Sequence, residues 1–277
     1  MQTSQTYLVN GVPNGFISPL DRGLAYGDGV FRTMKMVGGM PQFWPLHYQT
    51  LVADCGAIGI VCPSAELLMS DLLQLFTLEE TAVAKIIITR GEGARGYALP
   101  AIVHPTRLVL KSAMPQYPSH FEAGITLTVC ETRLAHQPKL AGVKHLNRLE
   151  NVLARTEWNN PEIADGILLD QHNLVIECTA GNIFARFGNE LRTPKLNNCG
   201  VNGVMRQRIL ALSKLLSLAK PLSLDVEEAE IDLADLLLAD EVIICNSLYG
   251  ALQVVKIQDK VFENHGLAKQ IRELTSI

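Results

Sequence analysis

The side chain best suited to chemistry is that of Lys144, because the stretch of chain around it is apolar and is expected to be extended. Leu140–Val143 precede it and Leu146 follows His145. An ammonium group without a partner is costly to bury, so a lysine in this setting needs an explanation. Most lysines simply reach solvent. The alternative is an amine that condenses with an aldehyde to form a Schiff base.

Two other features could support such an amine. Glu177 ends the apolar run Leu174–Glu177, and pattern alone favours a solvated carboxylate at a strand end. A buried carboxylate there could instead pair with a cation, and the protonated pyridine nitrogen of pyridoxal phosphate (PLP) is one. Residues 200–206 (GVNGVMR) precede an amphipathic helical pattern, where backbone N–H groups can bind an anion, although many glycine turns of this kind bind nothing.

The motifs of several other chemistries are absent or stand in the wrong structural context. Residues 91–96 read GEGARG and match G-x-G-x-x-G, but Pro100 and Pro105 prevent the long helix that a dinucleotide-binding turn must open. A mobile or ligand-facing loop is the better interpretation. No G-x-S-x-G motif occurs. The seven histidines lack the spacings of zinc sites, so the sequence predicts no metal, and His47 and His145 are expected to be hydrogen-bonded polar groups.

The elements that must position these residues mix strands and helices without strict alternation, which indicates an α+β fold. Ser64 is expected to cap a helix, and Asn147 with Glu150 fits the start of another. Residues 166–170 and 174–177 predict a hairpin, and further strands are expected at 85–89, 107–111, 125–129, 182–186, 190–192, 241–245 and 251–255.

The proline-containing stretch 114–121 is expected to link two domains. An N-terminal α/β domain would occupy residues 1–113, and a C-terminal domain carrying Lys144 would occupy residues 122–277.

Composition narrows the partners. The net charge of −4 and the scattered basic residues argue against nucleic acid, and no apolar run is long enough to span a bilayer. Six cysteines without a C-x-x-C pair, together with the lack of a signal-peptide pattern, predict reduced thiols in a cytoplasm. A small-molecule substrate is therefore expected.

Taken together, five segments resemble the class IV PLP-dependent aminotransferase family (fold type IV), and the resemblance covers nearly the whole chain. They are residues 21–35 (DRGLAYGDGVFRTMK), 88–97, 142–155 (GVKHLNRLENVLAR), 164–184 and 200–206. The resemblance implies a two-domain fold like that of D-amino acid aminotransferases, and a homodimer. It also implies PLP on Lys144, Glu177 facing the pyridine nitrogen, and a phosphate-binding region at Asn202, Gly203 and Ser247.

Within that family, residues 144–150 (KHLNRLE) and 95–97 (RGY) look most like the aminodeoxychorismate lyases. This implies release of p-aminobenzoate and pyruvate from 4-amino-4-deoxychorismate, a step of folate biosynthesis. Lys144 and Thr33 would be catalytic, and Arg95, Tyr97 and Phe31 would bind substrate. The alternatives are a D- or branched-chain amino acid aminotransferase and a degenerate PLP-binding protein.

One position departs from the family pattern. The family's phosphate-binding arginine lies in an H-x-x-R-L motif, which here reads His47-Tyr48-Gln49-Thr50-Leu51. A hydroxyl cannot supply the bidentate charged contact of a guanidinium. Arg206 and Arg148 are the candidate replacements, and otherwise cofactor affinity is lowered or catalysis is lost.

Overall fold

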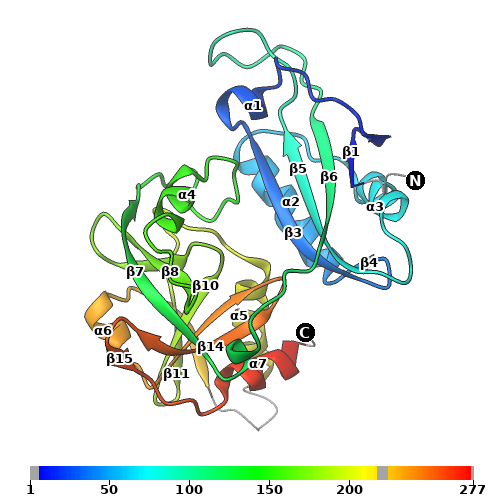
Figure 1. The fold of residues 1–277 in the computed structure, drawn as a ribbon. Coiled ribbons are helices and arrows are strands. Elements are labelled where there is room, and N and C mark those ends of the chain that lie inside the picture. Colours follow the sequence, from blue (N-terminus) through cyan, green and yellow to red (C-terminus); the bar gives the residue numbers. More distant parts are fainter. Residues whose placement is uncertain (1–5, 217–223, 276–277) are drawn as a thin grey trace. The chain divides into compact units, whose positions relative to one another are not determined.

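The computed structural model of the chain describes residues 6–216 and 224–275. Contacts within the chain divide it into two units (Figure 1). The first contains residues 1–116 and the short segment 143–147, and the second contains residues 117–142 and 148–277. The change from one unit to the other at residue 117 falls within the stretch 114–121 that the sequence assigns to a linker.

The first unit is built on an antiparallel sheet with the strand order β2-β1-β6-β5-β3-β4. Its helices α2 and α3 pack on one face of this sheet (Figure 1). The strands are β1 (Tyr7–Val9), β2 (Val12–Pro13), β3 (Gly29–Val37), β4 (Met40–Pro41), β5 (Thr81–Thr89) and β6 (Thr106–Ala113), and the helices are α1 (Arg22–Tyr26), α2 (Trp44–Ala57) and α3 (Ala65–Leu75).

Strand β3 shows how the first sheet separates its two faces. Val30, Arg32, Met34 and Met36 are buried, whereas the residues between them are only partly buried. Because side chains alternate along a strand, Phe31, Thr33 and Lys35 share the face opposite α2. Helix α3 begins as the sequence predicts, since the Ser64 hydroxyl accepts a hydrogen bond from the Leu67 N–H at 3.3 Å.

The second unit is built on a larger mixed sheet in the order β12-β11-β10-β13-β14-β7-β8-β9, with β15 beside β14. The strands are β7 (Ile125–Leu134), β8 (Ile163–Asp170), β9 (Val175–Cys178), β10 (Asn182–Phe187), β11 (Glu190–Pro194), β12 (Asp225–Ala229), β13 (Glu241–Asn246), β14 (Gly250–Ile257) and β15 (Lys260–Val261). The helices are the short 3-10 helix η1 (Ser119–Glu122), then α4 (Leu149–Arg155), α5 (Val204–Leu216), α6 (Leu233–Leu237) and α7 (Leu267–Thr275).

The α+β class and the predicted strands are confirmed. The hairpin expected at 166–177 forms between β8 and β9, which pair antiparallel. The apolar runs of β8, β9, β10 and β13 face the core of the second unit, which is lined by residues such as Ile167, Ile183 and Ile244. Burial of such side chains contributes about 1.5–3 kcal/mol each.

One expected helix start is wrong. Helix α4 begins at Leu149 with Arg148 in the cap position, not with Asn147 as its cap. The Asn147 side chain instead donates a hydrogen bond to the Gly27 carbonyl at 3.2 Å. A partner far along the chain has taken the amide that a local pattern assigned to the helix.

The GEGARG segment opens no helix, as the sequence predicts. Residues 90–105 contain neither helix nor extended strand, so this segment has no dinucleotide-binding architecture. In the described part of the chain, no helix has the length and apolar character needed to cross a membrane.

Candidate active site

The backbone around Lys144 is fixed against the beginning of β3, in the first unit. The Phe31 N–H donates to the Lys144 carbonyl at 2.9 Å, and the Leu146 N–H donates to the Gly29 carbonyl at 3.0 Å. His145 forms an isolated bridge with Val30. The apolar segment predicted to hold a reactive lysine is therefore an added strand-like edge of the first sheet.

The Lys144 side chain lies over an aromatic ring. Its Nζ is 4.8 Å from the centroid of Phe31, a distance at which a cation is attracted to the ring face. Thr33 follows Phe31 by two residues and shares its face of β3. The structure thus brings Lys144 and Phe31 together and places Thr33 on the same side of the sheet.

A second lysine on this face escaped the sequence analysis. Lys85 of β5 pairs directly with Thr33 of β3, and its Nζ lies 4.7 Å from the Phe31 centroid. Lys85 is half-buried, and burial lowers the pKa of its ammonium group. The signal was available, since Lys85 interrupts the apolar run Thr81–Thr89 in the same way that Lys144 interrupts its own segment.

A buried ion pair stands behind Lys144. Arg32, which is 2% exposed, pairs with Asp54 of α2. Asp54 Oδ2 also accepts a hydrogen bond from the Lys144 N–H at 3.4 Å. Burial raises the pKa of Asp54, and the positive charges of Arg32 and Lys144 oppose this shift. Through Asp54, the ion pair is linked to the backbone of Lys144. Removal of one partner from a buried pair is strongly destabilising.

Thr50 faces the interior of the first unit. Its hydroxyl donates to the Leu46 carbonyl of its own helix at 2.7 Å, and the residue is 7% exposed. One turn earlier, His47 is buried, and neither ring nitrogen has a hydrogen-bond partner among the described residues. The prediction that His47 is a satisfied polar group is therefore wrong. Burial, and secondarily the charge of Arg32, lowers the pKa of His47 to about 3.

Arg95 and Tyr97 extend from the loop after β5. Their side chains are exposed, Tyr97 by 85%, but the backbone between them is held. Gly96 N–H donates to the Tyr26 hydroxyl and the Arg22 guanidinium donates to the Gly96 carbonyl, both at 3.0 Å. The Tyr26 and Tyr97 rings are also in contact, with centroids 5.5 Å apart. The loop is fixed at its base and presents its side chains outward.

In the second unit, Glu177 is a buried carboxylate and not a solvated strand end. It is 3% exposed, and its Oε2 accepts a hydrogen bond from the Val201 N–H at 2.8 Å. Val201 belongs to the turn that precedes α5. Structure thus overturns the interpretation that pattern alone favoured, and it connects Glu177 to the glycine-containing turn.

That turn is also tied to the chain immediately before Lys144. The Gly142 N–H donates to the Gly200 carbonyl, and the Asn202 N–H donates to the Gly142 carbonyl, both at 2.9 Å. Arg206 supports the turn from α5, since its Nη1 donates to Asn202 Oδ1 at 3.0 Å. The same guanidinium donates to the Pro194 carbonyl and pairs with Glu228. Arg206 therefore positions Asn202.

Gly203 is required by a close approach. A Cβ at this position would lie 2.3 Å from the side-chain oxygen Oδ1 of Asn182. Asn182 cannot easily give way, because it is 5% exposed and its Nδ2 donates to the Val201 carbonyl at 2.8 Å. The turn from Glu177's partner to the start of α5 therefore has the shape that only glycine permits.

Ser247 lies in the turn between β13 and β14 and is partly buried. Its neighbour Asn246 shapes this turn, because Asn246 Oδ1 accepts from the N–H groups of Leu248 and Tyr249 at 2.9 and 3.1 Å. Arg148, the other candidate cation, lines a cavity of about 630 Å³ within the second unit, together with Asp165 and Tyr249.

The donor types fit PLP. An aldehyde needs an amine, and Lys144 supplies one on the first unit. A pyridinium needs a carboxylate whose charge is shielded from water, and the buried Glu177 is such a group. A phosphate needs backbone N–H donors. Those of Val201, Asn202 and Gly203 are bonded within the protein, so the beginning of helix α5, which the turn positions, is the part of the backbone that fits this need.

The chain is similar to known proteins over most of its length. The family model "Amino-transferase class IV" matches residues 29–257. An aminodeoxychorismate lyase of Vibrio harveyi is 38% identical over 249 residues, which cover 90% of each protein. A putative branched-chain-amino-acid aminotransferase of Methanocaldococcus jannaschii is 31% identical over 94% of this chain and 87% of the relative. The crystal structure of 4-amino-4-deoxychorismate lyase from Pseudomonas aeruginosa superposes with a TM-score of 0.89 at 39% identity, covering 97% of both chains.

Proposed function

The chain belongs to the amino-transferase class IV family, and from this premise we propose that it is a PLP-dependent lyase converting 4-amino-4-deoxychorismate to p-aminobenzoate and pyruvate. The observation that carries the proposal is its similarity, at 38% and 39% identity and nearly full length, to two lyases of that name. The buried Glu177 and the Lys144 amine over Phe31 are the local features that agree with it.

Lys144 would hold the cofactor through its amine, and Glu177 would hold a proton at the pyridine nitrogen. Asn202, Gly203 and Ser247 would bind the phosphate, with Arg206 keeping Asn202 in position. When bound, PLP supplies an electron sink for charge that develops on the substrate. Backbone N–H groups at the start of α5 would replace part of the contact that an arginine at position 50 would make.

In the reaction, the amine of Lys144 would remove the proton from the substrate ring carbon that bears the nitrogen. Glu177 would keep the pyridine nitrogen of PLP protonated, so that the negative charge left on the substrate is stabilised. Thr33 would donate a hydrogen bond to the oxygen of the departing enolpyruvate. Aromatisation of the substrate ring favours this departure and distinguishes the lyase from a transaminase.

The site must bind negative charge, because p-aminobenzoate and pyruvate each carry a carboxylate. Arg95 would orient one carboxylate, and Phe31 and Tyr97 would pack against the ring. Lys85, opposite Thr33 and half-buried, would provide a second cation. An ionic hydrogen bond in a desolvated setting is stronger than one at the surface.

The test is an assay of purified, PLP-loaded protein with 4-amino-4-deoxychorismate and without any keto acid. We expect equal amounts of p-aminobenzoate and pyruvate, and loss of both in a Lys144→Ala variant. Lys256→Ala, at an exposed position of β14, is the matched control and should retain activity. A Lys144→Ala protein as active as the wild type would refute the assignment of this lysine.

An aminotransferase is the second candidate, because the M. jannaschii relative is named as one and is 31% identical. Product formation that requires a keto acid acceptor, with no pyruvate release in its absence, would favour this candidate over the lyase. A degenerate PLP-binding protein would show neither activity. Its hallmark would be weak PLP binding that Thr50→Arg strengthens.

We further propose that the chain works as a homodimer in the cytoplasm. The support for the dimer is an apolar surface on α4, where Leu149, Val152 and Leu153 are 67%, 57% and 51% exposed. Large apolar side chains grouped on one helix are typical of an interaction surface. Sedimentation at micromolar concentration should give twice the chain mass, and a Leu149→Glu/Leu153→Glu variant should sediment as a monomer.

A further inference from the structure

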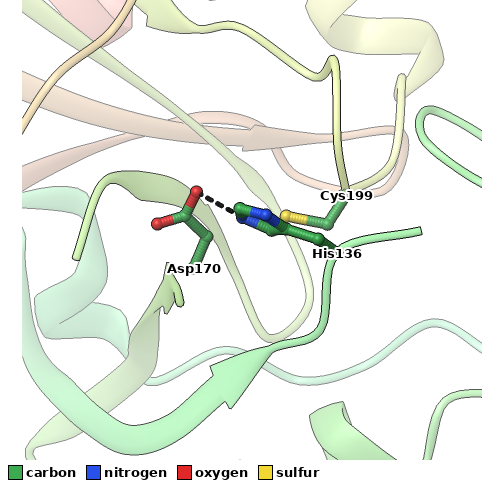
Figure 2. A group of neighbouring side chains, drawn as sticks. All are labelled: His136, Asp170 and Cys199. Carbon is green, nitrogen blue, oxygen red and sulfur yellow. Dashed lines mark hydrogen bonds and ion pairs between the residues drawn. The ribbon is translucent and has the colours of Figure 1, made fainter. Parts of the chain in front are cut away.

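Three side chains with metal-binding atoms converge in the second unit, apart from the residues assigned to the cofactor. His136 follows β7, Asp170 ends β8, and Cys199 precedes the turn before α5. A nitrogen of His136, a carboxylate oxygen of Asp170 and the sulfur of Cys199 all lie within 4.8 Å of one another. Figure 2 shows the Cys199 sulfur and the Asp170 carboxylate both directed towards the His136 ring.

The cluster is largely shielded from water. Asp170 and Cys199 are 2% and 7% exposed, and the His136 side chain is 20% exposed. This leaves one partly open side, through the imidazole. A closed cluster with one accessible edge is the arrangement in which three protein ligands hold a metal and a water completes its shell.

The carboxylate is already oriented by its surroundings. Asp170 Oδ1 accepts from the backbone N–H groups of His172 and Leu174 at 2.8 and 2.9 Å, and Oδ2 contacts His136 Nε2 at 2.8 Å. Burial tends to raise the pKa of Asp170, but these hydrogen bonds outweigh it and hold the pKa below its usual value. The carboxylate is therefore held in place, with Oδ2 next to the His136 ring.

The sulfur adds selectivity. A thiolate beside an imidazole and a carboxylate suits Zn²⁺ and Co²⁺, and it disfavours Mg²⁺ and Ca²⁺, which prefer oxygen ligands alone. A thiol binds a metal as its thiolate, so metal binding at Cys199 is coupled to loss of the S–H proton. Bonds of about 2.0–2.3 Å to the metal would draw the ligand atoms closer than their present spread.

We propose that His136, Asp170 and Cys199 form a binding site for a zinc-type divalent cation, with water as the fourth ligand. On binding, the Cys199 S–H bond breaks, a sulfur–metal bond forms and one proton is released to solvent. The metal replaces the direct contact between His136 and Asp170.

The site adjoins the turn that holds the buried carboxylate. Cys199 is followed by Gly200 and Val201, and the Val201 N–H is the group that donates to Glu177. A metal on Cys199 would fix the beginning of this turn to the ends of β7 and β8. Unfolding of the second unit would then require loss of the metal, so occupancy should raise its stability.

The experiment uses the full chain treated with a chelator and then dialysed against Zn²⁺. One equivalent of Zn²⁺ should remain bound, and thermal unfolding should shift upwards with the Zn²⁺ concentration. Titration with Co²⁺ should give visible d–d absorption of a tetrahedral complex with sulfur-to-metal charge transfer. Proton release, measured in buffers of different ionisation enthalpy, should be at least one per metal at neutral pH.

His136→Ala is the primary variant, because its partly exposed side chain can be removed with the least disturbance of the core. Cys199→Ala is the second, and circular dichroism checks that both are folded. Each should weaken Zn²⁺ binding by more than the roughly 10- to 100-fold that loss of an outer-sphere partner costs. Cys62→Ser and His120→Ala remove a thiol and an imidazole elsewhere and should bind Zn²⁺ as the wild type does.

The proposal is overturned by the absence of stoichiometric Zn²⁺ binding to the wild-type chain. It is equally overturned if folded His136→Ala and Cys199→Ala proteins bind Zn²⁺ with unchanged affinity, since the metal would then reside on other side chains. None of these measurements depends on enzymatic activity, so they stand apart from the test of the proposed lyase.

Discussion

Replacement of Gly203 by alanine should weaken PLP binding while leaving most of the fold intact. The added Cβ would lie 2.3 Å from Asn182 Oδ1, well inside van der Waals contact, so either the turn or the asparagine must move. Asn182 is buried and bonded to the Val201 carbonyl, and overpacking at such sites costs about 1–3 kcal/mol. The turn would therefore absorb much of the displacement.

If the strain falls on the cofactor-binding form of the turn, the same free energy appears as lost affinity. A cost of 1–3 kcal/mol corresponds to a rise in the dissociation constant of PLP by about 5- to 150-fold. Titration of the apoprotein with PLP, followed by absorbance, measures this constant. The unfolding temperature of the apoprotein should fall only slightly, because the rest of the fold is unchanged.

Gly56→Ala is the matched control, because nothing lies within 4 Å of a Cβ at this helical position. It should leave PLP affinity unchanged and stabilise the protein by about 0.5–1 kcal/mol. In an Asn182→Ala background the effect of Gly203→Ala should shrink, since the clashing oxygen is gone. Equal PLP affinity for wild type and Gly203→Ala would refute the role assigned to this turn.

Two further substitutions test the first unit. His47→Leu should flatten the acid dependence of stability: the pKa of His47 is 6.5 when unfolded and about 3 when folded, so its stabilising contribution is complete above 6.5 and is lost as pH falls towards 3, by up to about 1.4 kcal/mol per pH unit. Urea unfolding at pH 7, 6 and 5 measures this, and identical slopes for wild type and variant would contradict the buried neutral imidazole. Lys85→Met should lower kcat/KM for 4-amino-4-deoxychorismate by about 10- to 150-fold, the value of an ionic hydrogen bond of about 1.5–3 kcal/mol, whereas Lys256→Met should not, and an unchanged kcat/KM would exclude Lys85 from the substrate site.

Much of the fold could be predicted because its signals are local. The runs that become β5, β8, β9 and β13 are short, apolar and bounded by turn residues, and Ser64 marks its helix by position alone. Lys144 and Glu177 could be proposed as site residues because they lie in long motifs whose order and spacing follow the chain.

The features that could not be predicted depend on partners distant in sequence. Asn147 was expected to cap a helix, but its side-chain amide donates a hydrogen bond to the carbonyl of Gly27, 120 residues away. His136, Asp170 and Cys199 show no metal-ligand spacing, because three separate segments bring them together. His47 was expected to be satisfied, and only packing shows that both of its ring nitrogens are enclosed without a partner among the described residues.

The hydrogen bonds that hold the backbone at residues 144–146 make no use of the lysine side chain. Phe31, Gly29 and Asp54 all bind main-chain atoms of this segment. Removal of the lysine side chain should therefore leave the surrounding backbone unchanged, and a small soluble amine can diffuse into the vacated space. A Lys144→Ala protein should regain part of its activity when methylamine or ethylamine is added, with the size of the amine that works best reporting the space vacated by the side chain.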